Sequence, residues 1–293
     1  MEPIGKYMAE FQESWNKSRE RQGWKRLDEK EFDCEMHGKS KMLEWLSPEG
    51  ELHPATCPQC RQIKHEIKAQ EEAKAEAARI KALKLEKRLA NAMIPLRFKH
   101  KRLDGFVADT DEKKRVFEFI KRYAENFDVE ALQTGRSVIL SGGPGTGKTH
   151  LSIGVANHVI EMGGTAMFST VAGLVRRVRE SWSDKTETEQ EVIDLYSQPD
   201  LLIIDEIGVQ SGSENEHQIL FDIMNSRYEN MRPTILLTNL PILDIRKQNG
   251  EVEKKGLQGF IGDRVLDRMR EGGGKAFTLN WTSYRANRTQ EGS

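Results

Sequence analysis

The sequence has few cysteines, no long hydrophobic run and almost no net charge. Three cysteines cannot all pair, so a disulfide-stabilised scaffold is excluded and metal binding is the favoured role for these cysteines. No apolar run approaches the roughly 18 to 20 residues that cross a bilayer, and the start, MEPIGKYMAE, lacks the basic and apolar stretches of a secretory signal. These absences predict a cytoplasmic protein that does not enter the membrane.

The chain is long enough for two domains. A typical domain has roughly 150 residues, so 293 residues make about two, each able to bury its own core. Charged residues account for 31% of the chain and hydrophobic residues for 37%, and the mean hydropathy is -0.66. The protein is therefore polar but keeps the apolar residues that a globular fold requires.

Composition divides the chain into three zones. Residues 1–60 hold all three cysteines and three of the five tryptophans, and they predict a small module with a turn at residues 47–50. Residues 61–93 contain no glycine or proline and are rich in helix formers, so we expect one long helix. Its apolar positions keep no strict heptad, which favours an arm or a partner-binding helix over a coiled coil. Residues 94–293 form the third zone.

Basic residues concentrate in the helical zone and just after it. From residue 61 to residue 102 there are thirteen lysines and arginines but only five glutamates, an excess of +8 in a chain of net charge -1. A solvated helix face explains this excess, and so does a surface for nucleic acid or for an acidic partner. Both readings stay open.

The third zone alternates short apolar runs with helical stretches. We expect strands at residues 137–140, 166–169, 201–204 and 234–237. We expect helices at residues 112–126, 148–162, 172–182, 214–228 and 262–270. This alternation predicts an α/β fold, in which a parallel sheet is covered by helices on both sides.

A phosphate-loop motif lies between the first expected strand and the helix that follows it. It consists of Gly142, Gly143, Pro144, Gly145, Thr146, Gly147, Lys148 and Thr149. Glycines let backbone N–H groups turn toward phosphate oxygens, and the helix N-terminus adds its positive end. Lys148 can reach the β and γ phosphates and Thr149 can ligate Mg²⁺, so we predict a nucleotide site.

Two further strand ends carry polar residues. Asp205 and Glu206 follow the apolar run at residues 201–204, where Asp205 can hold Mg²⁺ and Glu206 can orient or deprotonate the attacking water. Asn239 follows the run at residues 234–237 and can lie beside the γ-phosphate. Two adjacent acids indicate hydrolysis rather than binding alone.

The order of these motifs resembles an AAA+ ATPase, and the flanking segments resemble the DnaC/DnaI-type replicative helicase loaders. Those segments are IPLRF at residues 94–98, GDRVLDRM at 262–269 and NWTSYR at 280–285. The resemblance implies ATP and Mg²⁺ as cofactors and self-assembly. It also implies a reduced helical lid, since little chain follows Arg285. By the same resemblance Arg268 is an arginine finger that acts on a neighbouring subunit and Arg285 is a second sensor of nucleotide. Arg264, one turn earlier, is an alternative finger.

The helix expected at residues 172–182 lies where the loader family lines a channel for single-stranded DNA. Arg176, Arg177 and Arg179 supply positive charge near the aromatic Trp182, as a groove that tracks the backbone and stacks bases requires. An amphipathic helix with its arginines in water explains the same residues equally well.

The cysteines form a metal-binding pattern. Cys34 and His37 make C-x₂-H, and Cys57 and Cys60 make C-x₂-C after a gap of nineteen residues. Two close ligand pairs joined by a loop suit tetrahedral Zn²⁺, and four protein ligands make the site structural. His53 or His65 can replace His37. A zinc-bearing N-terminal domain resembles the DnaI branch of the loaders, where it contacts the helicase.

With this resemblance, the motifs predict an ATP-dependent loader of a hexameric DnaB-type helicase onto single-stranded DNA. The domain boundaries are a zinc-binding module at residues 1–60, a basic helical arm at 61–93 and an AAA+ ATPase domain at 94–293. Two alternatives stay open: an IstB-like transposition ATPase, and a helicase adaptor that ATP switches without hydrolysis.

Overall fold

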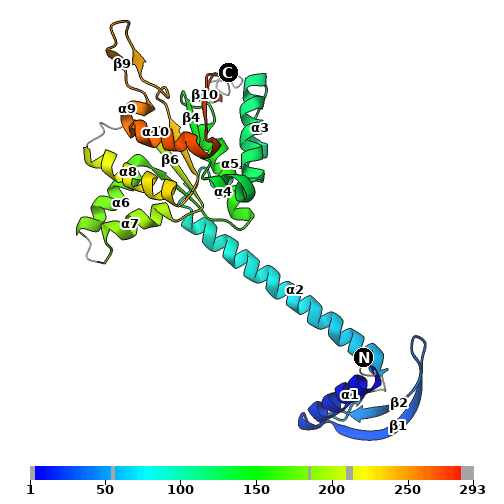
Figure 1. Cartoon of the computed structure of the whole chain (residues 1–293). Helices are drawn as coiled ribbons and strands as arrows, with labels where there is room; N and C mark the ends of the chain where they lie inside the picture. Colours follow the sequence, from blue (N-terminus) through cyan, green and yellow to red (C-terminus); the bar gives the residue numbers. More distant parts are fainter. Residues whose placement is uncertain (1–3, 54–56, 184–185, 209–213, 285–293) are drawn as a thin grey trace, which may run out of the picture. The chain divides into compact units, whose positions relative to one another are not determined.

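The chain folds as two units, residues 1–82 and 83–293, and helix α2 (Pro58–Asn91) runs across the boundary between them. Figure 1 shows the elements of each unit. The computed structural model describes residues 4–53, 57–183, 186–208 and 214–284. The helix expected at residues 61–93 is therefore present but begins three residues earlier, with Pro58 at its first position, where a missing N–H costs nothing.

The first unit packs a helix against a small antiparallel sheet. It contains α1 (Ile4–Arg21), β1 (Lys25–Cys34), β2 (Gly38–Leu46) and β3 (Leu52–His53), with β2 in the centre of the sheet. The turn predicted at residues 47–50 connects β2 to β3, and the Gly50 N–H donates to the Ser47 carbonyl at 3.0 Å. Composition gave no signal for the long hairpin, because β1 is densely charged and most of its side chains are exposed.

Three tryptophans and an arginine pack together in this unit. Trp45 is buried, and its ring meets the edge of Trp15 at 5.8 Å. The Arg19 guanidinium lies 4.3 Å from the centre of the Trp15 ring and 4.0 Å from that of Trp24. Such cation–π contacts let a small unit use a long charged side chain as packing material.

The second unit is built on a five-stranded parallel sheet in the order β10-β4-β7-β6-β5. Its strands are β4 (Val138–Gly142), β5 (Ala166–Thr170), β6 (Leu201–Ile207), β7 (Thr234–Thr238) and β10 (Lys275–Leu279). The four predicted strands are confirmed; each ends one to three residues later than expected, and β4 begins one residue later. Strand β10 was not predicted because it lies at the sheet edge and only Leu279 in it is buried.

Helices cover both faces of this sheet, as the alternation predicts. One face carries α3 (Asp111–Glu125) and α5 (Lys148–Glu161). The other carries α6 (Val171–Ser183), α7 (Glu189–Ser197), α8 (Glu214–Glu229), α9 (Leu257–Ile261) and α10 (Asp263–Arg270). Leu201 and Ile203 of β6 pack with the first layer and Leu202 and Ile204 with the second, because successive side chains of a strand face opposite sides.

The ends of the five predicted helices are confirmed to within one residue. Helix α7 is a correction, since no helix was expected from the sequence between residues 182 and 201. It begins with a capping box in which Thr188 and Glu191 bond each other's backbone N–H groups. The remaining elements are the short helices η1 (Leu103–Gly105), η2 (Phe127–Ala131), α4 (Leu132–Thr134) and η3 (Glu271–Gly273), and a hairpin of β8 (Ile245–Arg246) and β9 (Val252–Lys254).

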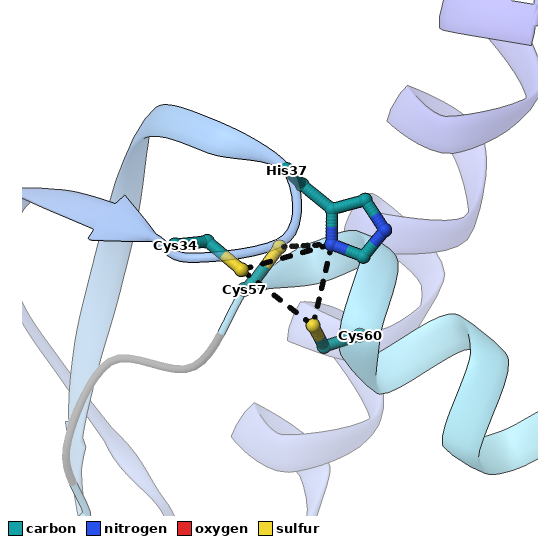
Figure 2. A group of neighbouring side chains, drawn as sticks. All are labelled: Cys34, His37, Cys57 and Cys60. Carbon is teal, nitrogen blue, oxygen red and sulfur yellow. Dashed lines mark hydrogen bonds between the residues drawn. The ribbon is translucent and has the colours of Figure 1, made fainter.

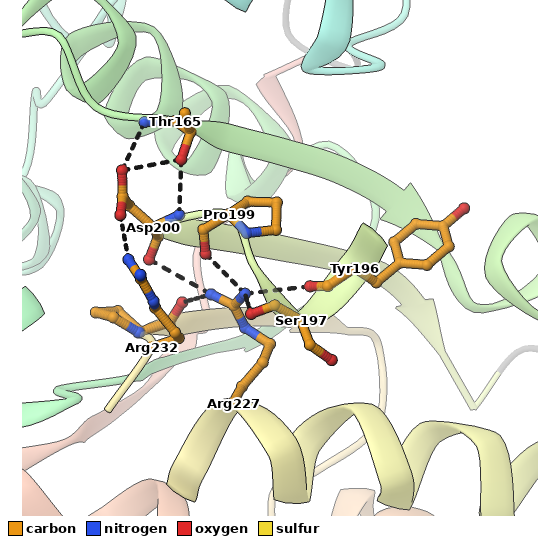
Figure 3. Close-up of polar contacts among 8 residues, drawn as sticks. Thr165, Tyr196, Ser197, Pro199, Asp200, Arg227 and Arg232 are labelled. Carbon is orange, nitrogen blue, oxygen red and sulfur yellow. Dashed lines mark hydrogen bonds and ion pairs between the residues drawn. The ribbon is translucent and has the colours of Figure 1, made fainter. Parts of the chain in front are cut away.

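A fully buried arginine ties the amino ends of two central strands together (Figure 3). Arg227, near the end of α8, donates to the Thr234 hydroxyl at 2.9 Å and to backbone carbonyls at the end of α7, in the α7–β6 connection and of Pro233. Burial lowers the pKa of Arg227 to about 9, which still leaves it protonated at neutral pH. One cation thus provides hydrogen-bond donors for several backbone carbonyls that are buried away from water.

Candidate nucleotide and metal sites

The phosphate-loop residues form the connection from β4 to α5 at the carboxyl edge of the sheet, where α/β sheets bind ligands. Gly145 and Gly147 have φ angles of 79° and 95°, which favour glycine. A Cβ atom on Gly147 would also lie 2.6 Å from the Phe106 ring. Phe106 was not singled out from the sequence; it fixes how closely the chain before α3 approaches the loop.

Lys148 is buried and turned toward the loop. Its ammonium donates to the carbonyls of Gly142 at 2.7 Å and Gly143 at 2.9 Å, and to Oδ1 of Asn239 at 2.9 Å. Strand β7 lies beside β4, and this brings Asn239 to the loop from 91 residues away. Lys148 and Asn239 therefore lie in one site.

The two residues predicted to hold Mg²⁺ also meet. The Thr149 hydroxyl donates to Oδ2 of Asp205 at 2.9 Å, joining the first turn of α5 to the end of β6. A hydroxyl and a carboxylate are hard oxygen ligands, so this pair would suit Mg²⁺ bound together with a nucleotide. Their role as ligands stays a prediction.

A distortion of β6 directs Glu206 out of the sheet. The pairing of β6 with β7 shifts register between Ile204 and Ile207, and Glu206 has a left-handed φ of 61° and is exposed. Its N–H donates to Oδ1 of Asp205 at 2.7 Å. Bulges and positive φ angles at non-glycine residues gather at functional sites, where they re-aim a side chain.

Thr238 holds this distortion in place and was missed as a functional position. Its buried hydroxyl donates to the Ile207 carbonyl at 2.8 Å and accepts from the Leu240 N–H at 3.0 Å. Its place beside Asn239 was the available signal. Thr238 thus holds the end of the strand that carries Asp205 and Glu206.

Arg268 lies at the opposite edge of the sheet from the phosphate loop of its own chain. It lines a cavity of about 360 Å³ together with Ser137 and Thr234, which mark the amino ends of β4 and β7. Its guanidinium donates to the Asn225 side chain and lies 4.9 Å from the centre of the Tyr228 ring. The alternative finger Arg264 is exposed on the same helix, and Arg285 lies outside the described residues.

The predicted DNA-contacting residues lie on α6. Arg176 and Trp182 are exposed, whereas Arg177 is ion-paired with Glu187 and Arg179 lies 3.5 Å from Glu216. The Trp182 indole donates to Glu189 at 2.8 Å. The opposite face of α6 is buried through Leu174, Val175 and Val178. Two of the three arginines therefore already have carboxylate partners.

Cys34, His37, Cys57 and Cys60 gather into one cluster, whose ligand atoms all lie within 4.8 Å of one another (Figure 2). The Cys34 and Cys60 sulfurs are 3.7 Å apart, and His37 Nδ1 lies 3.3 to 3.7 Å from the three sulfurs. Ordinary Zn–S and Zn–N bonds give tetrahedral edges of about 3.8 Å between sulfurs and about 3.6 Å between sulfur and nitrogen. The donor set and its spacing fit zinc.

The surroundings of the cluster favour thiolate formation at one cysteine. The Met36 backbone N–H and the His37 ring lower the pKa of Cys34 to about 6. A hydrogen bond to Cys34 raises the pKa of Cys60. The alternative ligands lie elsewhere: His53 packs against Trp24 and His65 against Phe11. Of the alternatives open at the sequence level, the geometry favours His37.

Comparison with known proteins identifies the family. The profile of the IstB-like ATP binding proteins matches residues 75–290. The replicative helicase loader DnaC of Buchnera aphidicola subsp. Acyrthosiphon pisum is 34% identical over 206 residues, which cover 70% of this chain and 77% of the relative. The chain belongs to the IstB-like ATP-binding family and is a DnaC-type homologue.

Other DnaC-type proteins agree with this assignment. DnaC of Escherichia coli K12 is 34% identical over 166 residues, covering 57% of this chain and 61% of the relative. A crystal structure of a DnaC helicase loader superposes with a TM-score of 0.52 at 20% identity, over 64% of this chain and all of that one, and shows the shared fold. Membership of this AAA+ family supports ATPase activity in general. None of the helices in the described part of this DnaC-type chain is long and apolar enough to span a bilayer.

Proposed function

We propose that this protein uses ATP to load a DnaB-type replicative helicase onto single-stranded DNA. The observation that carries the proposal is the convergence of Lys148, Asp205 and Asn239 on one sheet edge in a chain of the DnaC-type family. A cytoplasmic location, where DNA is replicated in bacteria, belongs to the same proposal.

Each residue of the nucleotide site has a distinct role in this proposal. Lys148 and the loop backbone bind the phosphates, and Thr149 with Asp205 holds Mg²⁺, which neutralises phosphate charge when bound. Glu206, exposed and re-aimed by the bulge, orients the attacking water. Asn239, bonded to Lys148, positions the lysine and senses the γ-phosphate.

Arg268 acts on the nucleotide of a neighbouring subunit. Its distance from its own phosphate loop, at the far edge of the sheet, supports a role in trans. Asn225 and Tyr228 hold the guanidinium without neutralising it, and within the described residues no carboxylate lies within 4.0 Å of it. Arg285 as a second sensor remains a prediction from the family.

The N-terminal module engages the helicase. Cys34, His37, Cys57 and Cys60 come from the β1–β2 hairpin and the start of α2; they would hold Zn²⁺, which would stabilise a unit with little other core. Single-stranded DNA contacts the exposed Arg176 and Trp182 of α6; the ion pairs of Arg177 and Arg179 make these two residues weaker candidates.

The alternatives differ from the loader in partner and in turnover. An IstB-like transposition ATPase would bind duplex DNA and a transposase, and the identity to proteins named as helicase loaders disfavours it. A non-catalytic adaptor would bind ATP without turnover, and the aimed carboxylate of Glu206 argues against that.

A reconstituted loading reaction tests the proposal. The full chain, the hexameric DnaB-type helicase of its host and circular single-stranded DNA are mixed with ATP, and helicase bound to DNA is measured after gel filtration. Parent chain should transfer helicase and Lys148→Ala should not, while Lys121→Ala, on the exposed side of α3, should match the parent. If the parent retains no helicase in pull-down and transfers none, the loader assignment is wrong.

A further inference from the structure

The last described residues of the chain lie directly against the phosphate loop. The Trp281 indole N–H donates to the Thr146 carbonyl at 2.9 Å, and the Tyr284 backbone N–H donates to the Gly145 carbonyl at 3.0 Å. The approach is so close that a Cβ atom on Gly145 would lie 2.0 Å from the Ser283 hydroxyl. We call residues 280–284 the C-terminal segment.

The pairing of β10 with β4 places the C-terminal segment beside the phosphate loop. Strand β10 runs parallel to β4, and Leu279 pairs with Gly142, so both strands end side by side. The chain that leaves β10 therefore runs beside the chain that leaves β4. The Trp281 ring is partly buried and packs against the core between the sheet and helices α3 and α5, so packing as well as the hydrogen bond holds it in position.

The two hydrogen bonds fix two peptide planes of the loop. In a planar trans peptide, the carbonyl of one residue and the N–H of the next point in opposite directions. Because the carbonyls of Gly145 and Thr146 point to the C-terminal segment, the N–H groups of Thr146 and Gly147 point away from it. Within the described chain neither of these N–H groups donates a hydrogen bond to another residue. Phosphate loops bind anions through such converging N–H groups.

We infer that Trp281 is a positioning residue for nucleotide binding, whose indole N–H holds the Thr146–Gly147 peptide with its N–H available to a phosphate oxygen. The inference deepens the proposed function, because it assumes that the loop binds ATP or ADP. It gives β10 and the segment after it a part in the nucleotide site that is independent of Arg285.

The substitution Trp281→Phe separates hydrogen bonding from packing, because phenylalanine keeps a large ring and removes the donor. In the full chain, we expect the dissociation constants of a fluorescent ADP analogue and of a fluorescent non-hydrolysable ATP analogue to rise about three- to tenfold, the range for one lost hydrogen bond. The KM for ATP should rise with them, while kcat at saturating ATP stays close to that of the parent. Trp24→Phe, the same change in the first unit, should bind both analogues like the parent.

Several outcomes would overturn the inference. The inference is wrong if Trp281→Phe binds nucleotide as tightly as the parent. It is also wrong if kcat falls together with the melting temperature of the nucleotide-free chain, since that result shows that Trp281 acts through packing alone. If Trp281→Phe melts early, Trp281→His, which keeps a ring N–H, must bind nucleotide more tightly than the phenylalanine variant; equal or weaker binding contradicts the role of the donor. The titrations need no helicase. If the parent chain binds nucleotide but loads no helicase, the proposed function is wrong, and the measured nucleotide affinities alone decide this inference.

Discussion

Lys148 and Glu206 lie at the same edge of the sheet but in opposite surroundings, one buried among hydrogen-bond acceptors and the other exposed. Lys148→Ala should abolish nucleotide binding, because it removes the cation proposed to bind the phosphates. Glu206→Gln should keep binding and stop turnover, because only the group that orients water is lost. Titration of a fluorescent ATP analogue together with phosphate release distinguishes the two variants. Hydrolysis at the parent rate by Glu206→Gln would show that another group activates the water.

Single functional residues were predictable where their motif lies within a short stretch of the sequence. The phosphate loop and the pairs C-x₂-H and C-x₂-C are local patterns, and the structure brings each set together. The left-handed backbone of Glu206 and the contact of Trp281 with Thr146 were not predictable, because each depends on strands that are distant in sequence. Spacing alone also could not choose His37 over His53 and His65.

At the scale of elements, the buried strands and amphipathic helices were predicted best. Leu201, Leu202, Ile203 and Ile204 are all inaccessible, so β6 appears as a continuous apolar run. Strand β10, with alternating exposure at an edge, and the charged strand β1 lack such a run. What defines these two strands is a hydrogen-bonded neighbour, which a local sequence pattern does not reveal.

The α7–β6 connection depends on one side chain of α8. Arg227→Met removes the donor to several buried carbonyls and should lower the free energy of unfolding by about 3 to 5 kcal/mol, the loss typical of a buried charged network. Urea unfolding followed by circular dichroism measures it. Arg122→Met, on the exposed face of α3, is the matched control and should change stability little. A change in Arg227→Met no larger than in the control would mean that the carbonyls find other donors.

At the scale of the whole molecule, the two units have separate interiors, and only the first contains the cysteine cluster. We therefore predict one Zn²⁺ per chain and, on chelation, loss of structure in the first unit without melting of the second. Structural zinc contributes on the order of 10 to 16 kcal/mol in small metal domains, more than this unit can replace. Elemental analysis gives the stoichiometry, and calorimetry with and without chelator resolves the two transitions. Absence of stoichiometric zinc from protein purified without chelator contradicts the site.

The final prediction concerns an assembly of several chains. Because Arg268 lies far from its own phosphate loop, ATPase activity per chain should rise with protein concentration, or with helicase and DNA that align the subunits. Arg268→Ala should lower turnover and spare nucleotide affinity, since the guanidinium stabilises charge that develops on the transferred phosphoryl group. Arg268→Lys should rescue poorly, because an ammonium cannot reproduce the planar fork. Arg270→Ala, on the same helix and exposed, is the control.

Mixing two inactive variants decides between action in cis and in trans. An Arg268→Ala chain keeps an intact phosphate loop, and a Lys148→Ala chain keeps its finger, so an interface between them contains one complete site. The mixture should recover part of the parent activity, measured as phosphate release at a fixed total concentration of chains. Native mass spectrometry establishes that both variants share assemblies. If such mixed assemblies stay inactive, Arg268 does not act across the interface, and the exposed Arg264 becomes the residue to test in the same way.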